Sequence, residues 1–238
     1  MGPIKGEITP DRDLLGKVHW SWFLPTLKTS SEMEQKLFLS SLSSYAAKNL
    51  AKVLILSSYA QEIPKIGKAY LRQILLNSLL GAKNTLIPES CLPATPLKAL
   101  SALSKTELIR LIDLLSLHDL AAELRQIVET KILKKIYSLL SEEERKFLKG
   151  AMAHKDHFVL MKMGLDRWDG SEETFRTLLH RRGLARLGAA LSGQDPNLIW
   201  HICHRLDIGR GNALFKYCKK EPIHGVSDVI VRQVETLL

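Results

Sequence analysis

Apolar residues recur at three- and four-residue spacing along most of the chain. Over residues 32–63 this spacing places the apolar side chains on one face of an α-helix. Ser30 or Ser31 is placed to cap the helix, and Pro64 ends it. A second helix is predicted over 68–80, because the same spacing continues there and Gly81 is a residue type that commonly ends helices.

Three prolines separate these helices from the rest of the chain. Pro88, Pro93 and Pro96 lie in a segment with little periodic apolar pattern, which predicts an exposed linker. We therefore expect an N-terminal helical region over 1–90 and a second domain over 97–238. Alternating strand patterns are absent, and the one Val/Ile-rich run, near the C-terminus, also fits a helix. The expected fold class is all-α, a helical bundle followed by stacked helical repeats.

The second domain repeats its own pattern after 67 residues. Without a gap, this shift pairs Leu108 with Phe175, Leu111 with Leu178, Leu120 with Leu187, Leu124 with Leu191 and Ile132 with Ile199. Ser104 and Ser171 precede the two units at the same offset and are predicted helix caps. Stacked helical repeats produce such a pattern, and the predicted units are about 104–150 and 171–220. A chance register of two leucine-rich segments is the alternative.

Composition and charge indicate a folded, basic protein of a reducing compartment. The 238 residues are 45% apolar, enough for a substantial core, and three distant cysteines fit a reducing compartment. The net charge is +9, and the segment 176–220 alone holds nine Lys or Arg residues against two acids. No long uncharged apolar stretch occurs, so we expect a cytoplasmic protein without a transmembrane segment. Such a basic segment can meet an acidic protein surface, anionic lipid or nucleic acid.

One short stretch combines residue types that bind metals. Asp195 and Pro196 predict the start of a helix that turns Cys203 inward and projects His201, His204 and Arg205 to solvent. A metal needs its ligands to converge on one point, which this arrangement prevents. We therefore expect no metal site and no cofactor, a core cysteine, and outward His201, His204 and Arg205 as candidate partner-binding residues.

Two further groups of residues are candidates for partner binding. Trp20 and Trp22 lie in the aromatic sequence HWSWF, which either anchors the N-terminal segment to its own helices or remains exposed for a partner. Arg181, Arg182 and Arg186 follow helical spacing and predict a cationic ridge that an acidic protein edge would complement. A merely solvated basic face is the alternative for the ridge.

The second unit resembles a known repeat. Its pattern is similar to an armadillo-type unit of the flagellar rotor switch protein family FliG, at positions Leu184, Leu187, Ala189, Ala190, Leu191, Gly193, Asp195, Leu198, Ile202 and Leu206. The resemblance covers about the last third of the chain. The Glu-His-Pro-Gln motif and the charged torque helix of that family are missing, so the resemblance implies the scaffold without the motor role. It implies a cytosolic accessory component of a type III secretion system, such as the chlamydial type, or of a flagellar-type complex.

The two functional hypotheses belong to different classes. The first is a non-enzymatic adaptor whose stacked helices bind other secretion-apparatus or rotor-like proteins, with peripheral association at the inner-membrane face. The second is a basic nucleic-acid-binding regulator, which lacks an evident base-reading helix. Enzymatic chemistry is not expected, because Gly209 and Gly211 follow no strand and the acids of residues 142–144 fit the first turn of a helix.

Overall fold

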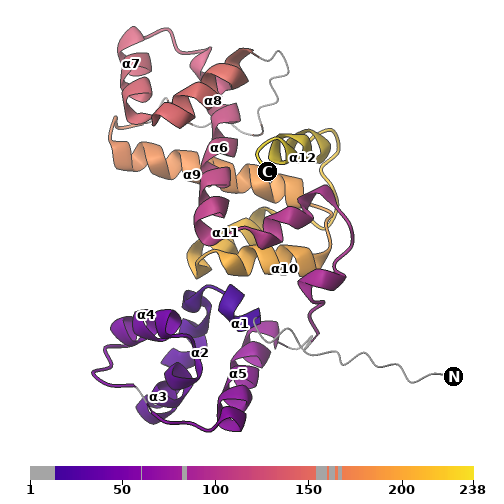
Figure 1. The fold of residues 1–238 in the computed structure, drawn as a ribbon. Helices are drawn as coiled ribbons and strands as arrows, with labels where there is room; N and C mark the ends of the chain where they lie inside the picture. The colour runs from indigo at the N-terminus through magenta and orange to yellow at the C-terminus, as the bar shows by residue number, and fades with distance from the viewer. Residues whose placement is uncertain (1–13, 60, 82–84, 154–159, 161–163, 166–167) are drawn as a thin grey trace, which may run out of the picture.

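The fold was obtained as a computed structural model that describes residues 14–59, 61–81, 85–153, 160, 164–165 and 168–238 (Figure 1). These described residues form helices and loops and contain no strand, as the sequence predicts. None of the helices in this part of the chain is long and apolar enough to cross a membrane.

The N-terminal region is a small group of helices around its own core. Its elements are α1 (Leu14–Lys17), the 3₁₀ helix η1 (Trp20–Phe23), α2 (Leu24–Lys28), α3 (Glu32–Ser41), α4 (Ser44–Leu54) and α5 (Lys65–Leu80). The single helix expected over 32–63 is wrong. The chain breaks it after α3, where the Ser43 side chain accepts from the Ala46 N–H and starts α4. Ser31 caps α3 with a capping box, and Gly81 ends α5, as predicted.

The proline-rich segment packs against the C-terminal half, so the exposed linker expected there is only partly right: most of its described residues are exposed, but Leu92 is buried. It contains the 3₁₀ helices η3 (Glu89–Cys91) and η4 (Pro96–Ala102), and Leu92 and Leu97 are buried. Prolines restrict the backbone without excluding apolar side chains between them from a core. We call residues 85–97 the strap, because they lie across a helix of the second unit.

The C-terminal half contains two sets of three helices in the same order. The first set is α6 (Lys105–Leu124), α7 (Thr130–Leu139) and α8 (Glu142–Ala153). The second set is α9 (Glu172–Leu191), α10 (Pro196–Arg205) and α11 (Ile208–Tyr217), followed by α12 (Ser227–Glu235). A shift of 67 residues superimposes the bounds of α6 on those of α9. It places α7 within one residue of α10 at both ends, and α8 within one residue of α11 at the start and three at the end. Ser104 and Ser171 cap the first helix of each set.

Helices α6 and α9 pack directly on one another and join the two sets (Figure 1). Gly183 lies at their contact, where an added Cβ atom would be 1.8 Å from the carbonyl oxygen of Ile112. Leu124 and Leu191, which the shift pairs, are both buried. The long helices therefore form the centre of the C-terminal half, and the shorter helices surround them.

Candidate functional site

Helix α10 lies between the N-terminal helices and the core of the C-terminal half. The face of α10 that carries His201 and His204, which was expected to meet solvent, is covered. His201 and His204 are only 3% and 5% exposed, so the expectation that they project to solvent is wrong. The physical reason is that the N-terminal segment and the strap pack on this face. Cys203 points inward as predicted, and burial raises the pKa of its thiol well above the ordinary value.

The aromatic residues of the N-terminal segment bind α10. The His204 ring is stacked between Trp22 and Trp200, with ring centroids 4.0 Å and 3.8 Å away. Trp22 Nε1 donates to the Leu206 carbonyl at 2.9 Å, and the His19 N–H donates to the His204 carbonyl at 2.8 Å. Trp22 therefore anchors the N-terminal segment to the second unit of the same chain.

The strap crosses α10 next to this stack. The Asn197 Oδ1 accepts from the Ile87 N–H at 3.2 Å, and His201 Nε2 donates to the Ile87 carbonyl at 2.9 Å. The Glu89 carboxylate receives Arg205 at 3.1 Å and Lys17 at 3.0 Å. Arg205 is thus held by the chain itself.

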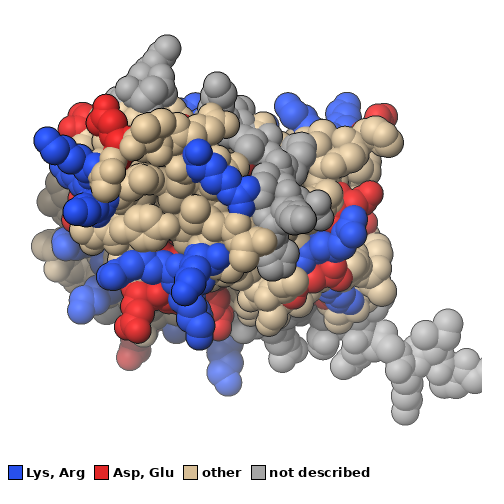
Figure 2. Space-filling model, turned by 90° about the horizontal axis from the view of Figure 1, so that it is seen from above, with Lys and Arg blue, Asp and Glu red and all other residues tan. Residues whose placement is uncertain are grey.

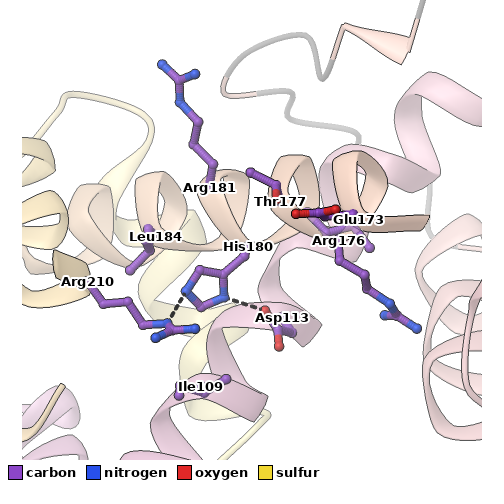
Figure 3. Close-up of a pocket in the computed structure, with 10 residues that line it drawn as sticks. Ile109, Asp113, Glu173, Arg176, Thr177, His180, Arg181, Leu184 and Arg210 are labelled. Atoms are coloured by element: carbon purple, nitrogen blue, oxygen red, sulfur yellow. Dashed lines mark hydrogen bonds and ion pairs between the residues drawn. The ribbon is translucent and has the colours of Figure 1, made fainter. Parts of the chain in front are cut away.

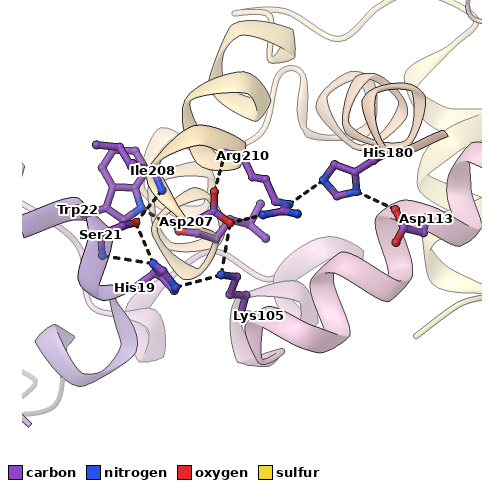
Figure 4. A network of polar contacts seen from close by, with 10 residues as sticks. His19, Ser21, Trp22, Lys105, Asp113, His180, Asp207, Ile208 and Arg210 are labelled. Carbon is purple, nitrogen blue, oxygen red and sulfur yellow. Dashed lines mark hydrogen bonds and ion pairs between the residues drawn. The ribbon is translucent and has the colours of Figure 1, made fainter. Parts of the chain in front are cut away.

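A chain of polar contacts continues from the N-terminal segment to both sets of helices (Figure 4). Lys105 Nζ lies 3.0 Å from His19 Nε2 and 3.4 Å from Asp207 Oδ2. Arg210 binds the Asp207 carboxylate and donates from Nε to His180 Nε2 at 2.9 Å. His180 in turn lies 2.7 Å from Asp113 Oδ1. Although burial opposes the change, hydrogen bonds from Arg210 lower the pKa of Asp207 to about 2.

The pairing of His180 with Asp113 resembles a catalytic pair, but its chemistry is different. Arginine can only donate, so His180 Nε2 must accept from Arg210 and its Nδ1–H donates to Asp113. A general base needs that lone pair free for a substrate proton. In this arrangement His180 is a structural link between the two sets of helices.

A hollow of about 440 Å³ opens beside His180. Arg176 and Arg181 line it, but Figure 3 shows their side chains pointing away from one another. Arg176 also donates to Glu144 at 2.6 Å. The cations therefore do not converge on a single anion position inside the hollow.

The predicted ridge of arginines does not exist as a surface feature. Arg186 is fully buried and forms an ion pair with buried Asp119, and its Nη2 donates to Gln233 at 2.7 Å. Burial raises the pKa of Asp119, against the opposing effect of Arg186. Helix α9 is enclosed by α6, α11 and α12 over its second half, so a residue one turn beyond Arg182 is already inside the core. Arg181 is exposed and Arg182 is partly buried.

The structure brings together four of the eight predicted residues around α10, namely Trp22, His201, His204 and Arg205, while Trp20 packs partly buried against the core of the N-terminal region. Sequence reasoning missed Glu89, which neutralises Arg205, and Asp119, which pairs with Arg186. A signal for the second pair was available. Asp119 and Arg186 are separated by the 67-residue shift, as are Asp113 and His180, so the repeat alignment itself paired them.

Comparisons of the chain with protein-family models, with curated proteins and with solved structures gave no match.

The stack around His204 predicts a pH dependence. Burial lowers the pKa of His204 to about 4 in the folded chain, whereas the ordinary value of 6.5 applies in the unfolded chain. Between these two pH values the imidazole is protonated in the unfolded chain and neutral in the folded chain. Stability should therefore fall as the pH drops from about 6.5 to about 4, by about 2 kcal/mol between pH 7 and 5 from this residue. His204→Phe keeps an aromatic ring, and urea unfolding at pH 7 and 5 should show a correspondingly smaller loss. An unchanged loss in that variant would contradict the assignment.

Loss of the Trp22 ring should release the N-terminal helices. Trp22→Ala removes both the stack and the hydrogen bond to Leu206, so we expect faster tryptic cleavage between residues 82 and 98 with the helical circular dichroism signal largely retained. Tyr45→Ala is the control, because Tyr45 is 70% exposed on α4. Equal cleavage rates in the two variants would show that Trp22 does not hold the junction.

Proposed function

We propose that this protein is a non-enzymatic adaptor built from two stacked helical repeats of armadillo-like type. The observation that carries the proposal is the contact between equivalent residues of the two sets: Asp113 with His180 and Asp119 with Arg186. Contacts between equivalent positions support a duplicated unit, because the two sets then meet through the same face of the same helix. Proteins of this architecture act mostly through their surfaces.

The finer proposal is a cytosolic component of a type III secretion or flagellar-type complex. Its support is the resemblance to FliG, whose matching positions behave as a scaffold here. Leu184, Leu187 and Leu191 are buried, Gly193 adopts φ +78 against Pro222, and Asp195 caps α10. These positions set helix packing, so they support a shared scaffold, while the identity of the partner rests on the resemblance.

The rival proposal is nucleic-acid binding through the basic segment 176–220. Within that segment Arg176, Arg205 and Arg210 are paired with acids and Arg186 is buried with Asp119. Their charges are thus partly or wholly neutralised internally. The exposed cations Arg181, Lys216, Lys219 and Lys220 form no ion pair among the described residues, so this segment keeps some capacity for phosphate, and the salt-dependent DNA measurement below decides between the two functions.

Two measurements test the adaptor function. The tagged full chain, crosslinked in its native cells and purified, should recover secretion-apparatus or rotor-like proteins identified by mass spectrometry. Fluorescence anisotropy with labelled random duplex DNA should show only weak binding near physiological salt. Tight DNA binding that weakens about tenfold or more for a few-fold rise in salt would favour the regulator instead.

A further inference from the structure

Helix α7 occupies in the first unit the place that α10 occupies in the second, but its outer face is open. In the second unit six residues of α10 are buried, four of them in the core of the C-terminal half, and the strap and the N-terminal segment cover the other two, His201 and His204. In the first unit Ile136 is the one buried residue of α7, and it is the counterpart of Cys203. The two equivalent helices therefore differ in what covers them.

The line of residues that holds the strap on α10 has polar counterparts on α7. Asn197, His201 and Arg205 lie four residues apart and bind the Ile87 N–H, the Ile87 carbonyl and the Glu89 carboxylate. The 67-residue shift places Thr130, Lys134 and Ser138 at these positions. All three are exposed. Thr130 and Lys134 have a hydroxyl and an ammonium group able to bind backbone or carboxylate groups, and the Ser138 hydroxyl, which donates to the Lys135 carbonyl at 2.7 Å, can accept from a backbone N–H.

The charge of α7 matches an acidic ligand. Lys131, Lys134 and Lys135 are exposed on this helix, and among the residues that the structure describes no acid forms an ion pair with them. Lys135 differs from the other two, because its Nζ lies over the Trp168 ring, 5.7 Å from the ring centroid. The acidic first turn of α8 is used elsewhere, since Glu143 pairs with Arg110 and Glu144 with Arg176. Figure 2, which looks onto the end of the molecule where α7 lies in Figure 1, shows groups of Lys and Arg side chains interspersed with Asp and Glu on this face.

Helices α7 and α10 also carry an aromatic ring at one equivalent position. Tyr137 is the counterpart of His204, which stacks on Trp22, and it is 37% exposed. Val128, just before α7, is 93% exposed. The open face thus combines a line of polar groups, three cations and an apolar margin.

We propose that the outer face of α7 binds an extended acidic segment of a partner protein, in the way that α10 binds the strap. The partner's backbone lies along Thr130, Lys134 and Ser138, and its carboxylates meet Lys131 and Lys134. This inference rests on the proposed adaptor function and names the class of partner. Charge complementarity favours an acidic segment over a second copy of the strap, which carries a single acid, Glu89.

A fluorescein-labelled oligoglutamate peptide is the first probe, measured by anisotropy on the full chain at low salt. Lys131→Glu with Lys134→Glu should weaken its binding by about tenfold or more. The control is Lys146→Glu with Lys149→Glu on α8, which makes the same charge change at the same spacing on exposed positions. It should change binding by less than about twofold. Equal losses in the two variants, or no binding by the wild type, would overturn the proposal.

Two further arms separate the alternatives. Thr130→Val with Ser138→Ala leaves the charge unchanged and should still weaken peptide binding by about threefold, because it removes two groups along the line. Undiminished binding would overturn the backbone-binding role of that line. Single-stranded DNA of matched charge should bind more weakly than the peptide, and tighter DNA binding lost in the α7 lysine variant would overturn the choice of a protein partner.

The failure of this inference is distinguishable from failure of the adaptor function. If crosslinking recovers the same secretion-apparatus proteins with wild type and with the α7 lysine variant, the adaptor function stands and α7 is not the docking surface. If the wild type recovers none of them but binds the peptide through α7, the proposed function fails while the α7 surface stands.

Discussion

Replacing Arg186 with Met should lower the free energy of unfolding by about 3–5 kcal/mol, the largest effect expected from any single side chain discussed for this protein. Asp119 would then stay buried, at 1% exposure, without its cationic partner. A carboxylate in that position must either remain charged in an apolar surrounding or take up a proton. Chemical denaturation at pH 7, followed by circular dichroism, measures the change.

Two controls distinguish charge pairing from simple loss of packing. Arg181→Met makes the same substitution at an exposed position of the same helix and should change stability by less than about 0.5 kcal/mol. The double variant Asp119→Leu with Arg186→Met removes both charges and should recover most of the loss, because apolar replacement of a whole buried pair is often neutral. A double variant as unstable as Arg186→Met alone would show that packing, and not the unpaired charge, causes the loss.

Much of the helical framework could be predicted from the sequence, because its causes are local. Ser31, Ser104, Ser171 and Asp195 cap their helices as expected, since a side-chain oxygen next to free N–H groups acts within a few residues. The 67-residue shift also anticipated that the second half contains two similar sets of helices. The spacing of apolar residues predicts helices over tens of residues when the same helix face is buried throughout.

The surroundings of each helix face could not be predicted in the same way. His201, His204 and Arg186 were expected in solvent because they are polar, but each is buried by a segment distant in sequence. Spacing tells which residues share a face, and only tertiary packing decides whether a second layer covers it. The same holds for the strap: its prolines predicted an exposed linker, although the apolar side chains between them pack against the C-terminal half.

The predicted site differs from the structure more than the predicted fold does, because the site depends on which helix faces tertiary packing covers. Of the residues expected to meet a partner, His204 and Arg205 bind within the chain, whereas Trp22 anchors the N-terminal segment, which was the first of its two expected roles. Comparing the two units position by position exposes what the chain covers in one and leaves open in the other, which is why α7 and not α10 presents a candidate docking surface.

Substituting Ala for Gly183 should cost about 3 kcal/mol or more, because the added methyl group cannot fit at the contact of α6 and α9. Its position would lie 1.8 Å from the Ile112 carbonyl oxygen and 2.8 Å from the Ile112 Cγ2. A backbone atom cannot rotate away as a side chain can, so the two long helices must separate. Because these helices join the two sets, the transition should also become less cooperative, with a lower denaturant slope in urea unfolding.

The matched control is Gly150→Ala in α8, which makes the same substitution inside a helix. Nothing lies within 4 Å of the added Cβ atom there. Alanine favours helix over glycine, so this variant should be more stable by up to about 1 kcal/mol. Opposite signs for two identical substitutions would locate the cost of Gly183→Ala in the helix contact. Stabilisation at both positions would mean that α6 and α9 do not approach closely in solution, and the pairing of Asp119 with Arg186 across them would lose its basis.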